Sequence, residues 1–196
     1  MKHLKLFEAF EDIDSICKRY NITNYTINSD GTVDVEGDVN LRQVLVDCLF
    51  HDDCFWGLTK LPLKFGKVTG DFDCSRNQLI SLDGAPKEVG GDFDCSYNQL
   101  TTLEGGPSHV DGGFFYCNNN QLITLEGGPR EVGGYFDCGD NPIHSIYKLF
   151  PYYKAFMDSL DYNYFRGTNI VKIRFKEACE EAGIRMPEKI EGYNYI

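Results

Sequence analysis

The stretch that decides the fold is residues 89–107, Val-Gly-Gly-Asp-Phe-Asp-Cys-Ser-Tyr-Asn-Gln-Leu-Thr-Thr-Leu-Glu-Gly-Gly-Pro. Closely similar sequence comes before and after it at a nearly constant interval. The repeated positions form five rows: Phe72, Phe93, Phe115 and Phe136; Cys74, Cys95, Cys117 and Cys138; Asn77, Asn98, Asn120 and Asn141; Leu79, Leu100, Leu122 and Ile143; and Leu82, Leu103, Leu125 and Ile146. A fixed period of about 20 residues predicts a solenoid, in which equivalent side chains of successive coils lie in line.

The phenylalanine and cysteine of each unit alternate with polar residues, which is the period-two pattern of a strand with one buried face. Glycine and proline after each unit stop a helix from forming there and favour turns. One coil of this length cannot bury its apolar side alone, whereas a stack of coils can. We therefore expect a stack of parallel strands with phenylalanine and cysteine facing inward.

The repeat also extends toward the N-terminus. Val35-Glu-Gly-Asp-Val-Asn-Leu41 has the layout of the later units, and its Leu-x-x-Leu is Leu58 to Leu61. The interval from Val35 to Val68 is much longer than the interval from Val68 to Val89, by more than half a unit. We therefore expect the first full repeat to carry an insertion within residues 42–57.

A solenoid exposes apolar surface and strand edges at its two ends, so both ends need caps. At the N-terminus, a helical spacing predicts an amphipathic helix through Leu6, Phe10, Ile13, Cys17 and Tyr20. A hairpin with its turn at residues 28–31 follows over residues 25–35. At the C-terminus, we expect an aromatic helix over 151–160 and a second helix, capped by Asn169 and ended by Gly183, that carries Val171, Phe175, Ala178 and Ala182. The last residues, 186–196, are expected to be extended and packed back. The expected parts are thus a cap at 1–34, a solenoid at 35–147 and a helical cap at 148–196.

The unit resembles the leucine-rich repeat, in the short form found in bacteria and bacteriophages. Phenylalanine, cysteine, asparagine and the two leucines fall on its last five anchor positions, and glycine stands where the first apolar anchor belongs. The resemblance covers about residues 24–196. Over this range the chain is similar to small phage-encoded repeat proteins of undetermined function. It implies an α/β solenoid with one parallel sheet, a short irregular convex side and capped ends, and it implies no particular activity.

Composition limits the classes of partner. The chain has 196 residues, a formal net charge of −11 and eight cysteines. Direct nucleic-acid binding is not expected without a basic surface, whereas an acidic surface suits a basic protein. The N-terminus does not resemble a signal peptide, and no stretch is apolar for the roughly 18 residues that a membrane span needs. We therefore expect reduced thiols and a cytoplasmic location, in the host if the chain is phage-encoded.

Three patterns could carry chemistry, and for each the sequence favours an interpretation without a metal or a catalytic site. Buried cysteine packs as a small apolar side chain, so the cysteine row predicts a core and not a metal centre. The asparagine row predicts side-chain amides that satisfy backbone groups between coils. Cys48 and Cys54, near His51, are farther apart than the usual zinc ligands and have no partner pair. No catalytic motif is present, so we expect no enzyme, no cofactor and no metal.

The outward strand positions are the candidate binding residues, and they would line the concave sheet surface of a leucine-rich repeat. They are acidic in the first two units and more aromatic in the next two: Asp71, Asp73, Arg76, Asp92, Asp94, Tyr97, Phe114, Tyr116, Tyr135 and Asp137. Asn119 and Asp140 continue the row that starts with Arg76. Phe55 and Trp56, in the insertion, form a possible second contact. Either these side chains bind a partner, or aspartate is a repeat residue that discourages aggregation; the sequence leaves both interpretations open.

Three functions follow as hypotheses. The first is a protein–protein interaction module, as a phage accessory or host-interaction protein. The second is an acidic mimic of nucleic acid that inhibits a host nuclease or defence protein, since spaced aspartates imitate phosphates. The third is a component of a virion or of its assembly.

Overall fold

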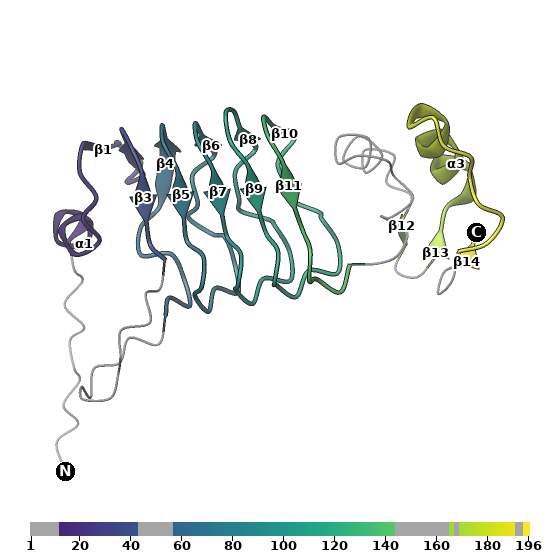
Figure 1. The fold of residues 1–196 in the computed structure, drawn as a ribbon, viewed down its shortest axis with the longest axis horizontal. Coiled ribbons are helices and arrows are strands. Elements are labelled where there is room, and N and C mark those ends of the chain that lie inside the picture. Colours follow the sequence, from purple (N-terminus) through teal and green to yellow (C-terminus); the bar gives the residue numbers. More distant parts are fainter. Residues whose placement is uncertain (1–11, 43–56, 144–164, 167–168, 191–193) are drawn as a thin grey trace, which may run out of the picture.

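The computed structural model describes residues 12–42, 57–143, 165–166, 169–190 and 194–196 (Figure 1). Its central part is a stack of coils whose strands form two sheets, parallel except for the first strand of one of them, so the predicted solenoid is confirmed. The first sheet, here called the valine sheet, has the order β1 (Tyr25–Ile27), β2 (Val33–Val35), β4 (Phe65–Val68), β6 (Glu88–Val89), β8 (His109–Val110) and β10 (Glu131–Val132). The second, the phenylalanine sheet, contains β3 (Val39–Asn40), β5 (Phe72–Asp73), β7 (Phe93–Asp94), β9 (Phe115–Tyr116) and β11 (Phe136–Asp137).

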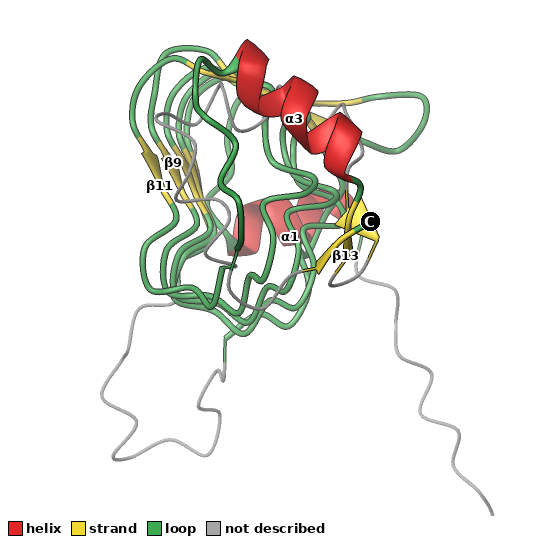
Figure 2. Cartoon of the chain, turned by 90° about the vertical axis from the view of Figure 1, so that its right-hand side faces the viewer, coloured by secondary structure: helices red, strands yellow, loops and turns green. Residues whose placement is uncertain are grey.

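The valine sheet is a feature that the sequence did not predict, because the expected coil had one strand and was otherwise irregular. A strand as short as Glu88–Val89 is too short to show an alternating pattern. Only residues 90–92 separate β6 from β7, so the two strands lie on adjacent sides of one coil. Figure 2 looks along the stack and shows the successive coils nearly superimposed, with loops on the remaining sides.

Glycines form the corner between the two sheets because the coils approach each other closely there. A Cβ atom on Gly90 would overlap the carbonyl oxygen of Thr69 in the preceding coil. A Cβ atom on Gly113 would overlap the carbonyl oxygen of Gly91 in the same way. The Gly-Gly pair of the repeat is therefore needed to let backbone pack on backbone.

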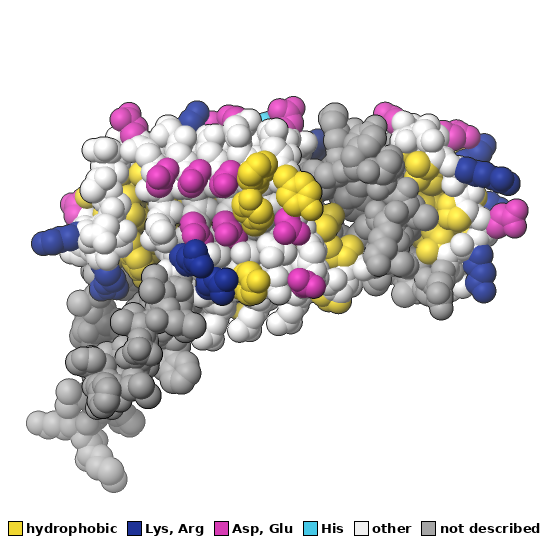
Figure 3. Space-filling view, in the orientation of Figure 1, with side chains coloured by type: hydrophobic (Ala, Val, Ile, Leu, Met, Phe, Trp, Pro, Cys, Tyr) yellow, Lys and Arg dark blue, Asp and Glu magenta, His cyan; other side chains and the backbone are white. Residues whose placement is uncertain are grey.

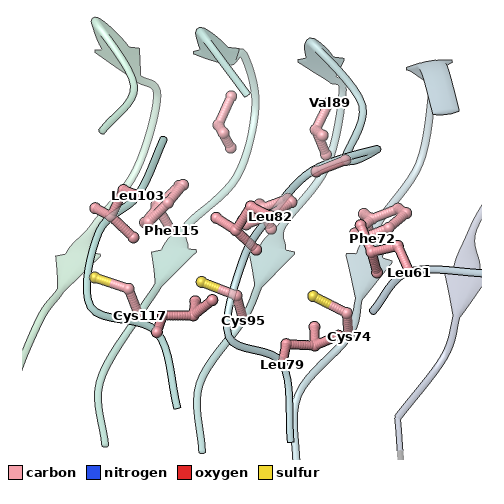
Figure 4. Packing of buried hydrophobic residues seen from close by; sticks show 14 of the residues in the cluster. Leu61, Phe72, Cys74, Leu79, Leu82, Val89, Cys95, Leu103, Phe115 and Cys117 are labelled. Atoms are coloured by element: carbon pink, nitrogen blue, oxygen red, sulfur yellow. The ribbon is translucent and has the colours of Figure 1, made fainter. Parts of the chain in front are cut away.

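The core consists of side-chain columns that run along the stack. The rings of Phe72 and Phe93 stack with centroids 5.5 Å apart, and Phe115 lies 5.1 Å from the ring of Phe93. Figure 4 shows the sulfur atoms of Cys74, Cys95 and Cys117 in a line beside this column, and all three cysteines are fully buried. Each stacked aromatic pair contributes about 0.5–1.5 kcal/mol beyond the area that it buries.

The asparagine row joins neighbouring coils through the backbone. Oδ1 of Asn98 accepts a hydrogen bond from the Leu79 amide at 2.9 Å. Its Nδ2 group donates to the carbonyl oxygens of Cys74 and Cys95, both at 3.1 Å. The remaining members of the row, Asn77, Asn120 and Asn141, make equivalent bonds.

Strand pairing bridges the long first repeat, with one register shift between Val33 and Val35. Val35 pairs with Val68, and Val39 pairs with Phe72, although the extra stretch of chain separates the partners of each pair. The amide of Leu58 donates to Oδ1 of Asn77 at 2.8 Å, as the amide of Leu79 does to Asn98 one coil later. The chain therefore leaves the repeat pattern after residue 42 and has rejoined it by Leu58. The possible second contact, Phe55 and Trp56, and the group Cys48, His51, Asp52, Asp53 and Cys54 lie outside the described residues.

A helix and a hairpin precede the first coil. Helix α1 (Ile13–Arg19) begins after Asp12, whose Oδ1 accepts a 2.7 Å hydrogen bond from the Ser15 amide. Cys17 is the buried residue of this helix. Strands β1 and β2 form the predicted hairpin, because they pair antiparallel and a turn joins them at residues 28–31. The predicted helix positions Leu6 and Phe10 lie outside the described residues.

The C-terminal part contains β12 (Phe165–Arg166), β13 (Asn169–Ile170), helix α3 (Lys172–Glu181) and β14 (Asn194–Tyr195). The prediction that Asn169 caps the helix is wrong: the N-cap is Val171. Asn169 belongs instead to a strand that pairs with both β12 and β14, so its backbone is extended and the helix starts later. Phe175 and Ala178 are buried, and Gly183 follows the helix with φ 68°. The aromatic helix expected over 151–160 lies outside the described residues.

We predict that the change Asn98→Ala lowers the free energy of unfolding by about 2–4 kcal/mol. It leaves the buried Leu79 amide without its acceptor and removes one of the two asparagine donors to each of the carbonyl oxygens of Cys74 and Cys95. Urea unfolding followed by circular dichroism measures the change. The control Gln99→Ala, at the exposed neighbouring position, should change stability by less than about 0.5 kcal/mol. Equal losses in the two variants would contradict the proposed role of the asparagine row.

Candidate binding face

The outward side chains of the phenylalanine sheet form one continuous surface, here called the outer face. The structure brings the predicted binding residues together on it in three rows: Asp71, Asp92, Phe114 and Tyr135; Asp73, Asp94, Tyr116 and Asp137; and Arg76, Tyr97, Asn119 and Asp140. Each row crosses consecutive coils, with Asp73 paired to Asp94 and Asp94 paired to Tyr116. In Figure 3, acidic side chains give way to hydrophobic ones toward the C-terminal coils.

The aspartates of the first row have a structural role that sequence reasoning missed. Oδ1 of Asp71 accepts a hydrogen bond from the Asp92 amide of the next coil at 2.7 Å. Asp92 does the same for the Phe114 amide, and Asp38 for the Asp71 amide. Each carboxylate thus ties its coil to the following one, which is a reason for the repeat to carry aspartate here. The recurrence of aspartate before the inward phenylalanine was the available signal.

Phe114 and Tyr135 interrupt this row with aromatic side chains. In the earlier coils, each carboxylate accepts a hydrogen bond from the equivalent amide of the next coil. The ring of Phe114 has no oxygen that could accept such a bond from the Tyr135 amide. In exchange, 42% of Phe114 and 62% of Tyr135 are exposed to solvent. The coil of Phe114 therefore lacks this side-chain link to the coil of Tyr135, and both coils place large aromatic groups on the surface, a combination that stability alone does not favour.

The second row combines aspartates with one tyrosine. Oδ1 of Asp94 accepts a 2.8 Å hydrogen bond from the Ser96 amide, which closes a local turn. Burial raises the pKa of the Asp94 carboxyl, and the hydrogen bonds from Ser96 act in the opposite direction. Tyr116 follows in the next coil, and its ring meets that of Phe114 edge to face at 5.9 Å and 73°. The exposed Phe114 of the first row and the half-buried Tyr116 of the second are thus in direct contact.

Carboxylates of neighbouring coils affect the titration of the Tyr116 hydroxyl group. Burial raises the pKa of Tyr116, and the negative charges of Asp92, Asp94 and Asp137 raise it further. These three carboxylates come from the coils before and after Tyr116. The aromatic part of the outer face therefore lies in a negative electrostatic field.

The third row has an unusual backbone conformation. Arg76 and Tyr97 have φ values of 56° and 53°, in the left-handed region that glycine and asparagine adopt more easily. Such a conformation costs other residues roughly 1–2 kcal/mol. The guanidinium of Arg76 lies over the ring of Tyr97, 4.5 Å from its centroid, and 45% of Tyr97 is exposed. The repeat spacing predicted the position of this row, but not its conformation or this cation–π contact.

The cysteine row has the chemistry of a core. Burial raises the pKa of Cys74, Cys95 and Cys117 well above the usual range, so these thiols are protonated at neutral pH. Cys138, at the last described coil, is only half-buried. Within the described ranges, no group of three or more histidine, cysteine, aspartate or glutamate side chains is placed to hold a metal ion. No helix in the same ranges has the length and apolar character that crossing a membrane requires.

The described coils form a parallel β-solenoid with an acidic and aromatic outer face. The chain matches no protein-family model, no curated protein and no solved structure. The features of the outer face are therefore the basis for a functional proposal.

The burial of the cysteine row predicts an order of thiol reactivity. Iodoacetamide should label Cys138 of the native protein before Cys74, Cys95 or Cys117, because the three buried thiols are inaccessible. Burial raises the pKa of all four thiols, and that of Cys138 less than the others. Peptide mass spectrometry of samples taken over time gives the labelling of each site. Unfolding in urea should remove the difference. Labelling of Cys95 in the folded protein at the rate of Cys138 would show that the core is not formed as described.

The raised pKa of Asp94 predicts a pH-dependent effect of the change Asp94→Asn. Because the pKa is higher in the folded than in the unfolded chain, the folded chain binds the proton more tightly, and stability from this group rises as pH falls. Above the raised pKa, the charged carboxylate weakens the fold. The variant keeps an acceptor for the Ser96 amide and removes the charge, so its melting temperature should exceed that of the wild type at pH 7. The advantage should shrink as pH falls through the raised pKa; an advantage independent of pH would contradict the assignment.

Proposed function

We propose that this protein is a non-catalytic interaction module and that its outer face binds another protein. The observation that carries the proposal is the replacement of aspartate by Phe114 and Tyr135 in the first row. Both side chains are exposed, and Phe114 contacts Tyr116, so three aromatic residues are available on one surface. Aromatic residues surrounded by polar groups are typical anchors of protein interfaces.

A stacked solenoid is well suited to this function. The side-chain amides of the asparagine row and the carboxylates of Asp71 and Asp92 fix each coil against the next. The outer face is therefore formed before a partner arrives, and little backbone freedom is lost on binding. The aspartates beside the aromatic residues would attract a basic partner and repel an acidic one.

The wider setting of the function follows from the repeat. The resemblance to short bacterial and bacteriophage leucine-rich repeats supports a phage accessory or host-interaction role in the cytoplasm. Within this proposal, α1 with the β1–β2 hairpin and the C-terminal part serve as the two caps of the solenoid. The buried Cys17 of α1 and the pairing of β2 with β4 support the N-terminal cap.

A second candidate is the acidic mimic of nucleic acid, which the regular spacing of the aspartates favours. Asp71 and Asp92 lie in one row, and Asp73 and Asp94 lie in the neighbouring row on the same coils. The structural hydrogen bonds of these four carboxylates explain their recurrence without mimicry, so the interaction module ranks first. Affinity for a partner that normally binds nucleic acid would fall steeply with added salt, whereas binding anchored by aromatic groups would fall modestly.

The test is the simultaneous change of Phe114, Tyr116 and Tyr135 to serine. Affinity purification from native cells, followed by mass spectrometry, should identify partners that the wild-type chain retains and the triple variant loses. We expect at least about a tenfold loss of affinity for such a partner, because three anchors are removed. The control variant Ile80→Ser with Ile123→Ser removes two exposed apolar side chains outside the outer face and should retain the partners. Retention of every partner by the triple variant would refute the proposal.

A further inference from the structure

The border between acidic and aromatic side chains on the outer face has a definite chemical preference. Phe114 and Tyr116 meet edge to face with their centroids 5.9 Å apart, and Tyr135 extends the first row beyond Phe114. Asp92 and Asp94 occupy the same two rows one coil earlier, and Asp137 pairs with Tyr116 one coil later. A ligand placed on these rings would therefore meet carboxylates on both sides of Tyr116.

The carboxylates at this border retain capacity for a ligand. Their bonds to the backbone use Oδ1: that of Asp92 accepts from the Phe114 amide at 2.7 Å, and that of Asp94 from the Ser96 amide at 2.8 Å. An ionised carboxylate has about four lone-pair sites, so Asp92 and Asp94 can each accept a further donor; the Ser96 side chain and the charge of Arg42 already act on Asp94. Two ion pairs of the described residues, Lys67–Glu88 and Lys176–Glu180, lie away from the outer face.

These features exclude two kinds of occupant. A purely apolar group on the rings would exclude water from the neighbouring carboxylates without replacing their hydrogen bonds, which is unfavourable. A nucleic acid or another anion would meet the negative charges of Asp92, Asp94 and Asp137. A cation satisfies both parts of the border, because the face of an aromatic ring attracts positive charge and carboxylates accept its hydrogen bonds.

We infer that this border is a binding site for an arginine side chain of the partner protein. The guanidinium lies over Tyr116 between Asp94 and Asp137, and the aliphatic stem lies against Phe114 and Tyr135. The inference rests on the proposed function and specifies the chemistry of the partner. Arginine fits better than lysine because its planar head can stack on a ring and bind a carboxylate through two donors. The third row already contains such a contact, in which Arg76 lies over the ring of Tyr97 at 4.5 Å.

The probe for the test is the peptide acetyl-Gly-Arg-Leu-Arg-Leu-Arg-Gly-amide, titrated into the full chain by calorimetry at low salt. The matched peptide carries citrulline, which is uncharged and of the same shape, in place of each arginine. We expect the arginine peptide to bind and the citrulline peptide to bind about tenfold more weakly or not at all. No binding of the arginine peptide, or equal binding of the two, would overturn the inference.

Two variants with the same change of net charge test where the arginine binding site lies. Asp92→Asn with Asp94→Asn keeps the acceptors for the backbone amides and removes two charges, and it should weaken the arginine peptide about tenfold. Glu104→Gln with Glu126→Gln removes two charges from exposed turns outside the outer face and should change affinity less than about twofold. Equal losses in the two variants would mean attraction by net charge alone, and would overturn the inference.

The inference and the proposed function can fail separately. A cellular partner could need Phe114, Tyr116 and Tyr135 but bind the variant with Asp92→Asn and Asp94→Asn with the same affinity as the wild type. In that case the inferred arginine binding site is wrong and the proposed interaction module stands. If the triple serine variant retains every partner, the proposed function itself is refuted, whatever the peptide does.

Discussion

The structure depends on hydrogen bonds that join one coil to the next. Backbone bonds between coils continue beyond strands as short as Phe93–Asp94, as from the Tyr97 amide to the Asn118 carbonyl oxygen. Side chains add further bonds that hold the register. Asn98 supplies both an acceptor and a donor to the preceding coil, while Asp71 supplies an acceptor to the following one. A side chain that makes such bonds in every coil fixes the rise and rotation of the stack, and with them the position of every outward group.

The fixed stack converts the repeat into a surface with defined rows. The same register that stacks Phe93 on Phe115 in the core places Asp94 next to Tyr116 outside. Differences between coils therefore appear as local changes within a regular array. On the first row, Phe114 stands where a carboxylate would join the next coil, and Phe114 and Tyr135 add exposed aromatic groups, which is why this border carries the functional proposal. The left-handed backbone at Tyr97, with Arg76 packed on its ring, is a second place where local strain accompanies an exposed side chain.

The sequence was enough to predict the solenoid, the inward rows of Phe93 and Cys95, the hairpin before the first coil and the membership of the outer face. Such features follow from periodicity, because equal spacing places equal residues in line whatever the details of each coil. The helix cap at Asn169 was predicted wrongly, because a capping residue type says nothing about whether a distant strand will pair with it. Here β14, from the end of the chain, pairs with β13 and keeps Asn169 extended.

Only the tertiary structure decided the features that depend on atomic contacts between residues of different coils, because sequence spacing does not specify such contacts. The valine sheet depends on the close approach of glycine corners, as at Gly90 and Thr69. Strands as short as Glu88–Val89 show no period-two alternation, although their valines recur from coil to coil. The role of Asp71 depends on an amide in the next coil, and the field around Tyr116 depends on carboxylates from two other coils. Periodicity determined which residues share a row. The distance between coils, set by packing and hydrogen bonding, determined what the members of a row do to one another.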